Sequence, residues 1–474
     1  MKRLLALGLT GLVAACAVGP DFERPAPPAV QSYTATPLPT GFVSGQDLAA
    51  DWWTLFHSPA LDALVKQALV ANPTLEAAKA SLRQAHELTS AQRTAFFPTL
   101  TGDLTQVRGK NAQDSIAPPT QLVDPYYSLY TAQLSLSYTP DFWGATRRAV
   151  EAAEAQEQGT RFQYEAAYIT LSANVVVTVI EEASLRAQLA ANRRLLAIAH
   201  ELTEKLERQR AIGTASELDL LAQRSLEAQM AQAIPPLEKQ LAQTRDALAA
   251  LLGVTPAELS DDEIGLDALA LPADMPVSLP AKLVEQRPDV RQAAEAMHQA
   301  SAEVGVALAD MLPNITLTGA LGSGALTPSK LFTPGNGFWS VGSSLTQTLF
   351  DAGALLHKRR AADAALDAAG AQYRAAVLGA FQNVADALEA LKADADAQNA
   401  ADTADQAARK SWDLARRQRE IGMINLVILL NAEQSYRQAE INLIAARAAR
   451  LSDSAGLFQA LGGGWWNRQE AEAQ

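Results

Sequence analysis

The 474-residue chain contains one cysteine, Cys16, and five histidines that are scattered along the sequence. A single cysteine cannot form an internal disulfide, and the histidines show no spacing typical of a zinc site. Glycine-rich phosphate loops, the G-x-S-x-G nucleophile motif and C-x-x-C pairs are also missing. The sequence therefore predicts no catalytic residues, no metal site and no cofactor. We expect a protein that is not an enzyme.

Positive charge is scarce as well. The chain has 39 Lys and Arg against 52 Asp and Glu, which gives a net charge of −13. A nucleic-acid partner requires a basic surface, so none is expected. Beyond residue 15 we recognise no apolar stretch as long as a membrane-spanning helix, and strands are therefore the expected way to cross a membrane.

The lone cysteine directly follows a hydrophobic segment. Lys2 and Arg3 precede a 12-residue apolar run that is too short to span a membrane as a helix. This layout predicts a signal peptide over residues 1–15. The segment resembles a bacterial lipobox, which implies that Cys16 becomes an acylated N-terminus. Ala17, rather than Asp, implies sorting to the outer membrane. A chance cysteine in a flexible terminus is the alternative.

Residues 16–60 are rich in proline and predict an extended tether that is anchored by the lipid. The remainder is an internal duplication, in which NPTLEAAKASLRQA (72–85) aligns with RPDVRQAAEAMHQA (287–300) at an offset of 215. Further along, Gly213 matches Gly422 at an offset of 209. That second offset persists to the end of the repeat, which indicates helices of matched length.

Each repeat is expected to hold a short helix, a β-hairpin, a long helix and a returning helix. The long proline-free stretches would each extend roughly 105 Å as helices, and Pro235-Pro236 should kink the first returning helix. Alternating segments such as 131–139 have the length of membrane-spanning strands. The predicted class is mixed and mainly α. Repeat 1 is predicted at 61–280, with its β-hairpin at about 99–140, its long helix at about 142–212 and its returning helix at about 214–252. Repeat 2 is predicted at 281–462, with the same three elements at about 314–349, 352–421 and 423–461. A C-terminal tail at 463–474 follows.

Several segments in a fixed order carry a resemblance to a known family: CAVGPDFERP, DWWTLFHSPALDALVKQALVANPTL, DFWGATRR, RPDVRQAAEAMHQASAEVGVALADMLPNITLTG and LFDAGALLHKRR. With them the chain resembles the TolC-type outer-membrane efflux factors, in their lipoprotein (NodT-like) branch. The resemblance implies a homotrimer with four transmembrane strands per chain in one shared 12-stranded β-barrel, and long helical hairpins that form a periplasmic tunnel. Such a protein is lipid-anchored in the outer membrane of a Gram-negative bacterium.

The function implied by this resemblance is a passive conduit for small molecules in a tripartite efflux system. The partners would be a periplasmic adapter (membrane fusion) protein, an inner-membrane resistance-nodulation-division pump and outer-membrane lipid. A channel for type I protein secretion and a non-conducting periplasmic coiled-coil lipoprotein are the alternatives. The sequence does not name the exported compound, because the selecting site normally belongs to the pump.

Two groups of residues are candidate sites by resemblance. The hairpin reversals would dock on the adapter, although glycine in a tight turn explains their composition equally well. These reversal residues are Arg210, Ile212, Gly213, Thr214, Arg419, Ile421, Gly422 and Met423. The family closes its pore with acidic residues in a D-x-L-D-A segment, where this chain reads ILLNA. The candidate constriction residues are therefore Ile428, Asn431 and Asp219. For Asp219, a position on a solvated helix face is the alternative. The nearest carboxylate to Ile428 and Asn431 is Glu433, which is expected on a different face of the helix.

Five basic residues follow the strand-to-helix crossings, where positive charge opposes the helix dipole. They are Arg147, Arg148, Lys358, Arg359 and Arg360. Contact with lipid headgroups or with acids of a neighbouring copy is one interpretation. A solvated helix face is the other.

Overall fold

The computed structural model describes residues 17–30, 32–34, 42–110, 126–261, 263–271 and 275–468. The predicted signal peptide, Cys16 and the last six residues of the predicted tail lie outside these ranges. The chain forms two compact units. Unit 1 takes its described residues from the segments up to 25, 83–159 and 293–373, and unit 2 from 26–82, 160–292 and 374 onwards. Each unit therefore draws on both halves of the duplication, so the predicted repeats are not separate compact bodies.

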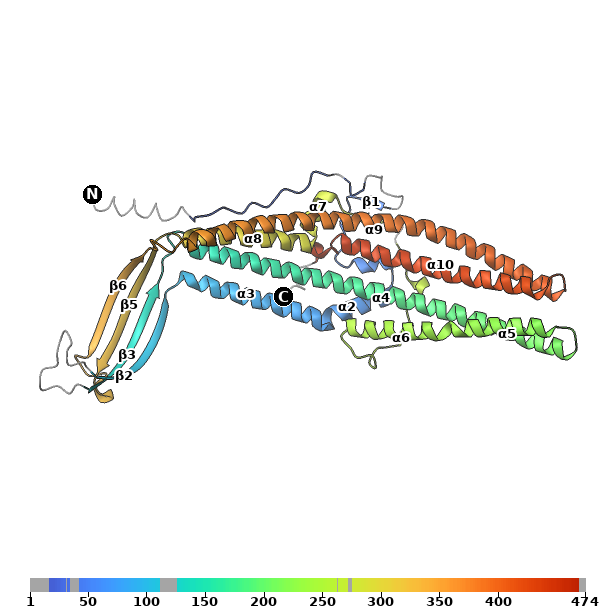
Figure 1. Ribbon diagram of the computed structural model, residues 1–474, viewed down its shortest axis with the longest axis horizontal. Coiled ribbons are helices and arrows are strands. Elements are labelled where there is room, and N and C mark those ends of the chain that lie inside the picture. The colour runs from blue at the N-terminus through green and yellow to red at the C-terminus, as the bar shows by residue number, and fades with distance from the viewer. Residues whose placement is uncertain are drawn as a thin grey trace. The chain divides into compact units, whose positions relative to one another are not determined.

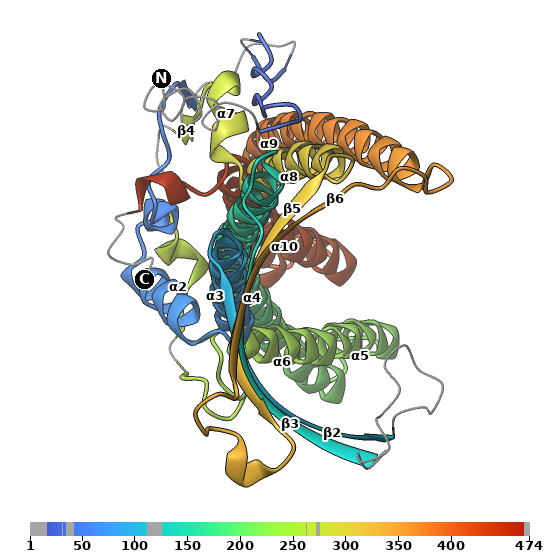
Figure 2. The same cartoon turned by 90° about the vertical axis from the view of Figure 1, so that its left-hand side faces the viewer.

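Unit 1 contains a four-stranded antiparallel sheet. Its strands are β2 (Thr99–Lys110), β3 (Tyr126–Tyr138), β5 (Asn314–Ala325) and β6 (Gly337–Thr346), in the order β2-β3-β5-β6. Figure 1 shows the strands side by side, and Figure 2 shows the curvature of the sheet. Each repeat supplies one hairpin, and pairing of β3 with β5 joins the two hairpins. The strands are 10 to 13 residues long, which is enough to span a membrane when tilted.

The helices that adjoin the sheet start at capped turns. Helices α4 (Ala145–Ala211) and α9 (Ala354–Glu420) follow Gly144 and Gly353, whose φ values are 83° and 90°. The Asp141 carboxylate accepts hydrogen bonds from the Thr146 and Arg147 amides. Asp351 does the same for Gly353 and Leu355. These carboxylates supply negative charge where the helix dipole favours it, and so offset the basic residues that follow.

Unit 2 consists mainly of helices. It contains α2 (Pro59–Ala71), the first part of α3 (Pro73–Arg93), most of α4 and α9, α5 (Glu217–Gln232), α6 (Ile234–Leu251), α7 (Pro280–Gln286), the first turn of α8 (Pro288–Ala309) and α10 (Leu426–Ala460). A short parallel pair joins β1 (Phe42–Ser44) to β4 (Met275–Val277). The core packs Trp52, Phe56 and Phe458 against α2 and the middle of α4.

The duplication is visible in the helix bounds. Helices α4 and α9 both have 67 residues and are offset by 209 at each end. The returning arms have the same offset, with α5 starting at Glu217 and α10 at Leu426. The first arm is broken at Ala233, just before Pro235-Pro236, whereas α10 is continuous. The predicted interruption by the proline pair is therefore confirmed.

Two sequence expectations were wrong. Residues 48–60 are not an extended tether, because Trp52, Trp53 and Phe56 form a buried 3-10 helix in the core of unit 2. Aromatic burial here outweighs the proline-rich composition upstream. Secondly, one segment of α4 is long and apolar enough to cross a membrane by length and composition, with a mean hydropathy of 1.3. Half of that segment is buried inside the chain, where Val175, Val176 and Ile180 belong to the core.

Candidate functional site

The two helical hairpins reverse through nearly identical turns. Gly213 and Gly422 both have φ = +78°, a conformation that favours glycine. Their N–H groups donate to Arg210 O and Arg419 O at 2.9 and 3.0 Å. The following residue of each turn donates to a carbonyl five positions earlier, at 2.8 Å in both tips. These bonds satisfy the last carbonyls of each long helix, as a Schellman motif does.

The predicted docking residues divide into two kinds. Ile212, Ile421 and Met423 expose 76%, 71% and 69% of their surface, and apolar groups that exposed mark a contact surface. The polar members are engaged within their own turns instead. Arg210 pairs with Glu217, the Arg419 guanidinium donates to Ile424 O at 3.2 Å, and the Thr214 hydroxyl donates to Gln209 O at 3.0 Å.

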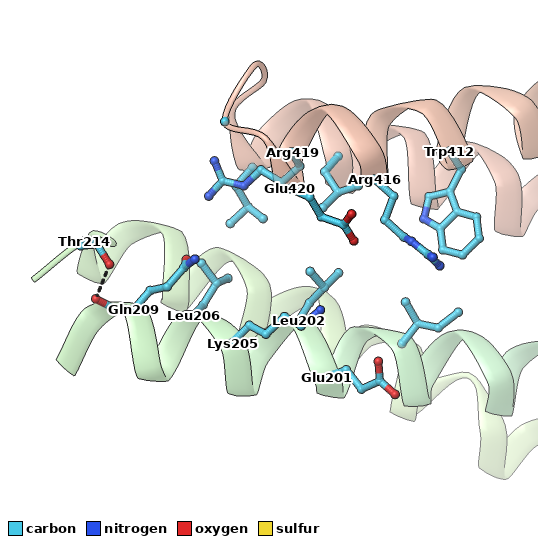
Figure 3. A pocket seen from close by; sticks show the side chains of 14 residues that line it. Glu201, Leu202, Lys205, Leu206, Gln209, Thr214, Trp412, Arg416, Arg419 and Glu420 are labelled. Atoms are coloured by element: carbon cyan, nitrogen blue, oxygen red, sulfur yellow. Dashed lines mark hydrogen bonds between the residues drawn. The ribbon is translucent and has the colours of Figure 1, made fainter. Parts of the chain in front are cut away.

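A groove of about 490 Å³ lies between the ends of the two hairpins, inside unit 2. In Figure 3, Leu202 of α4 points toward Trp412 and Arg416 of α9, and Glu420 points toward α4. The apolar lining includes Leu206, Leu426 and Leu429, while the charged lining residues are Glu201, Lys205, Arg416, Arg419 and Glu420. This groove was not predicted from the sequence. The i, i+4 spacing of Leu202 and Leu206 was the available signal.

Two of the three candidate constriction residues, Ile428 and Asn431, lie on an exposed helix face. Ile428 is 49% exposed, and Asn431 lies one turn further along the same face of α10. Asp219 is half-buried in the first turn of α5. Glu433 is fully buried, so the expectation that it lies on another face of α10 is confirmed. Burial raises the pKa of Glu433 to about 7.

A second acid with a raised pKa, the half-buried Asp394, lies on α9 beside Asp453 of α10. Burial and a hydrogen bond to Asp453 raise the pKa of Asp394 to about 6. The first hairpin behaves differently. There, hydrogen bonds from Thr203 and His200 outweigh burial and lower the pKa of Glu227. The two hairpins therefore shift the pKa values of these carboxyl groups in opposite directions.

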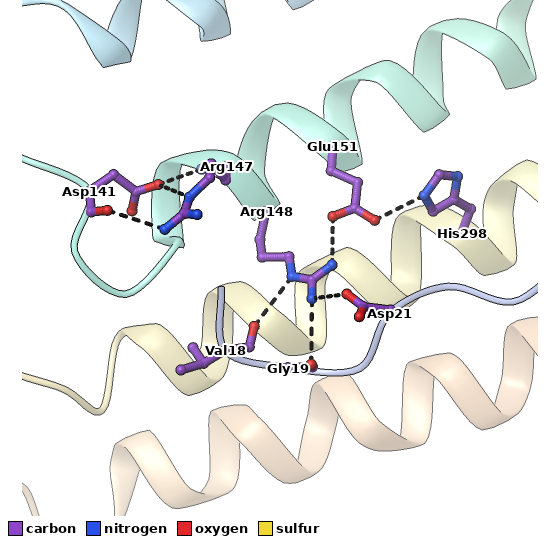
Figure 4. Close-up of polar contacts among 8 residues, drawn as sticks. All are labelled: Val18, Gly19, Asp21, Asp141, Arg147, Arg148, Glu151 and His298. Atoms are coloured by element: carbon purple, nitrogen blue, oxygen red, sulfur yellow. Dashed lines mark hydrogen bonds and ion pairs between the residues drawn. The ribbon is translucent and has the colours of Figure 1, made fainter. Parts of the chain in front are cut away.

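The arm that follows Cys16 is bound to unit 1 (Figure 4). The Arg148 side chain is 5% exposed and donates to Asp21 at 2.7 Å, to Glu151 at 2.8 Å and to the carbonyls of Val18 and Gly19. Burial alone lowers the pKa of Arg148, but the hydrogen bonds to Asp21 and Glu151 reverse the effect and raise it. Beside this cluster, the Phe22 ring stacks on His298 at 4.4 Å, and Arg24 pairs with Glu295 at 3.1 Å.

This cluster corrects one sequence-based hypothesis. Arg148 is not available to a headgroup or a neighbouring copy, because its side chain is buried and hydrogen-bonded within its own chain. Arg147 is bound to Asp141 at 3.2 Å. Lys358, Arg359 and Arg360 are exposed, so both interpretations stay open for them. Sequence alone could not reveal the Arg148 contacts, since Asp21 lies 127 positions away.

The sheet has two chemically different faces. In register, Leu100 lies opposite Leu136, Leu134 opposite Leu321, and Leu321 opposite Trp339. On the other face Thr101 lies opposite Ser135 and Thr105 opposite Thr131. The apolar face is exposed, with Leu104, Trp339 and Val341 each at least 75% accessible. An apolar band on one face and hydroxyl groups on the other is typical of a transmembrane barrel wall.

Within the described ranges, no group of three or more His, Cys, Asp or Glu side chains lies close enough to hold a metal ion. The features that stand out are surfaces rather than a reaction centre. They are the apolar sheet face, the hairpin tips and the groove between them. Such an arrangement can insert in a membrane and contact partners.

Comparisons with known proteins agree with this geometry. The family model described as outer membrane efflux protein matches residues 64–254 and 279–463. The chain is 29% identical to the pyoverdine export outer membrane protein OpmQ of Pseudomonas aeruginosa, over 100% of this chain and 99% of that one. It is 27% identical to the cation efflux system protein CusC of Escherichia coli, over 97% of each chain.

Among solved structures, the outer-membrane channel OprN superimposes with a TM-score of 0.88 at 28% identity, covering 95% of this chain and 100% of the other. CusC superimposes with a TM-score of 0.81 at 25% identity, covering 94% and 100%. The matched segments include both helical hairpins and all four strands of the sheet. The chain belongs to the outer membrane efflux protein family and is an outer-membrane efflux channel.

Proposed function

We propose that this channel works as a homotrimer in a tripartite efflux system. Three copies contribute four strands each to one 12-stranded barrel in the outer membrane, and their helices form a tunnel across the periplasm. The channel is a passive conduit. It receives small molecules from a periplasmic adapter and an inner-membrane resistance-nodulation-division pump, which supplies the driving force.

The observation that carries this proposal is the open four-stranded sheet. Among the residues that the structure describes, its outer strands, β2 and β6, each pair on one side only. Its apolar face is exposed. Lipid does not tolerate open strand edges, because their backbone groups lack partners there. Pairing of β2 of one copy with β6 of the next would satisfy both edges and leave the hydroxyl-bearing face toward the lumen.

We further propose that Cys16 is acylated after removal of residues 1–15. The next residue, Ala17, lies so close to Gly144 that a Cβ on that glycine would come within 2.6 Å of the Ala17 Cα. Gly144 precedes α4, near the end of β3. This contact supports an acyl anchor at the periplasmic leaflet, beside the strand-to-helix crossing. Because the barrel itself holds the membrane, the lipid is an auxiliary anchor and a sorting signal.

The hairpin tips and one face of α10 are assigned as follows. The exposed side chains of Ile212, Ile421 and Met423 dock on the adapter. Ile428 and Asn431 line the constriction, where an isoleucine and an amide replace the acidic residues typical of the family. Asp219 occupies the corresponding position of the first hairpin and contributes a carboxylate beside them.

The compound exported stays open in this proposal. Relatives of similar identity are named for different cargoes, pyoverdine in one case and cations in the other. Overall identity therefore does not select a cargo. Small molecules are the class proposed, and no feature of the described residues favours protein secretion.

Light scattering of the detergent-purified protein, followed by planar-bilayer recording, tests the proposal. We expect a mass of three chains plus detergent and discrete conductance steps. A monodisperse monomer would contradict the shared barrel. A trimer that never conducts, even after substitutions that loosen the tips, would favour the structural periplasmic lipoprotein. Cys16→Ser behind a conventional signal peptide should still give inserted trimers, and a complete loss of insertion would refute the auxiliary role of the lipid.

A further inference from the structure

Glu433 is a buried acid with no partner in the second hairpin. Its side chain is 0% exposed, and neither carboxylate oxygen has a hydrogen-bond partner. Because this burial is complete within one chain, a neighbouring copy in a trimer cannot reach these oxygens. A buried ionised carboxylate without a partner is strongly unfavourable, so burial favours the neutral acid.

The first hairpin shows how the same positions can be paired. At the offset of 209, Arg416 and Glu433 of the second hairpin correspond to Glu207 and Arg224 of the first. Glu207 and Arg224 form an ion pair at 2.7 Å. The second hairpin carries the same two charges in reversed order, yet its acid is left unpaired.

Arg416, the residue that would pair with Glu433 by this correspondence, makes a different contact. The Arg416 guanidinium lies over the Trp412 ring, 5.2 Å from its centroid, and Trp412 stacks on Tyr436 at 5.3 Å. Arg416 also lines the groove between the hairpins, as Figure 3 shows. The second hairpin therefore has two arrangements open to it: Arg416 on Trp412 with a neutral Glu433, or an Arg416–Glu433 ion pair like that of the first hairpin.

We propose that Glu433 is a positioning residue for the constriction, and that its proton holds the second hairpin in the closed arrangement. Loss of the proton draws Arg416 from Trp412 toward Glu433 and shifts the face of α10 that carries Ile428 and Asn431. The inference rests on the proposed role of that face in the constriction. It goes further by naming a control that lies inside each chain.

The charged groups around Glu433 do not account for its raised pKa. The titratable groups on the helices around it are Arg194, Glu201 and Lys205 on α4, Arg224 and Glu227 on α5, Asp405, Arg409, Asp413 and Arg416 on α9, and Tyr436, Arg437 and Glu440 on α10. Four of them form ion pairs of their own: Arg194 with Glu440 at 2.5 Å, Arg224 with Glu207 at 2.7 Å, and Glu227 with His200 at 2.8 Å. Burial is the only cause of the raised pKa of Glu433, and none of these groups contributes.

The sign of the pH effect follows directly. The pKa of Glu433 is raised from 4.5 to about 7 in the folded chain. The arrangement with a neutral Glu433, and with Arg416 on Trp412, is therefore most stable below pH 4.5 and becomes less stable as the pH rises through 7. A shift of this size corresponds to a change on the order of a hundredfold in the opening equilibrium, so a change of about tenfold is a conservative expectation.

The test is hydrogen exchange of the α10 amides in the intact assembly at pH 5.5 and pH 8.5, corrected for intrinsic exchange, alongside bilayer conductance. In the wild type, protection near residues 426–437 should fall by about tenfold or more at the higher pH, and conductance should rise. Glu433→Gln, which is permanently neutral, should lose the exchange response at residues 426–437 and the rise in conductance, whereas any response near Asp453 that comes from Asp394 should persist. Glu204→Gln, at an exposed position on α4, is the matched control and should respond like the wild type.

A charge-swapped variant keeps the test decisive if Glu433→Gln fails to assemble. Combined Glu433→Arg and Arg416→Glu reproduces the order of the first hairpin and should give a pH-independent ion pair. A pH response at residues 426–437 that survives in either variant would overturn the proposal, as would a wild type whose protection at those residues does not change. A wild type that responds in exchange but conducts at neither pH would count against the channel assignment and leave the role of Glu433 standing.

Discussion

The two helical hairpins share a backbone plan but are held together by different chemistry. Thr203 and Glu227 of the first hairpin correspond to Trp412 and Tyr436 of the second, at the constant offset of 209. In the first hairpin the Thr203 hydroxyl donates to Glu227 at 2.6 Å, and His200 binds the same carboxylate at 2.8 Å. In the second hairpin two aromatic rings stack at the same place.

This difference shows that the backbone geometry of the two hairpins is shared, whereas the side-chain contacts that hold their helices together are not. The turns, glycines and helix lengths are repeated because they set where each hairpin reverses. The side chains between the helices are free to differ. The first hairpin uses exposed ion pairs that respond to salt and acid, whereas the second uses aromatic packing and carboxyl groups whose pKa values are raised. Hairpins of one shape can therefore respond to pH in opposite directions.

The largest difference between the hairpins should come from Trp412→Ala. The ring is 8% exposed and contacts both Tyr436 and Arg416. Its removal should lower the free energy of opening the second hairpin by about 3–5 kcal/mol. Thr203→Ala, the equivalent change in the first hairpin, should cost only about 1 kcal/mol. Native-state hydrogen exchange measures both, and equal losses would contradict the aromatic role.

Glu227→Gln should weaken the first hairpin alone, by about 1.5 kcal/mol at pH 7. The pKa of Glu227 is lowered, by the Thr203 hydrogen bond first and then by His200 despite partial burial. Its contribution is therefore present above pH 4.5 and is lost as the pH falls through the lowered pKa. Urea unfolding followed by a probe on α5 should show the effect at pH 7 and lose it in strong acid. A loss of the same size at both pH values would point to packing instead of charge.

Asp394→Asn should act in the opposite direction. Its carboxyl pKa is raised from 3.8 to about 6, by burial first and then by Asp453. The packing of α9 on α10 is therefore strongest below pH 3.8 and weakens as the pH rises through 6. The variant should stabilise the second hairpin at pH 8 by about 1 kcal/mol, after allowance for solvent screening. At acidic pH it should have almost no effect, and destabilisation at pH 8 would refute this assignment.

The glycine turns should show the smallest difference. Gly213 and Gly422 share the same φ, and a Cβ added to either would meet no other described segment within 4 Å. Ala at each position should cost about 1–2 kcal/mol through backbone strain alone. The two costs should agree within about 0.5 kcal/mol. A clear inequality in exchange at the two tips would show that the turns are not equivalent.

The features that were predictable from sequence are local ones. Glycine at the reversals, the proline break before α6 and the buried face of Glu433 follow from turn geometry and helix periodicity. The contacts of Arg148 were not predictable, because they depend on an arm more than 100 positions away. The burial of Trp52 and the placement of Arg416 on Trp412 likewise depend on which elements meet in the folded chain. Neither meeting is encoded in local spacing.

The most direct test of this account is the protonation state of Glu433 itself. An infrared difference spectrum between the wild type and Glu433→Gln isolates the carboxyl band of this residue in the intact assembly. We predict a protonated carboxyl band at pH 5.5 that disappears with a midpoint near the raised pKa of about 7, in step with the loss of α10 protection. A Glu433 carboxyl that is already ionised at pH 5.5 would contradict the account.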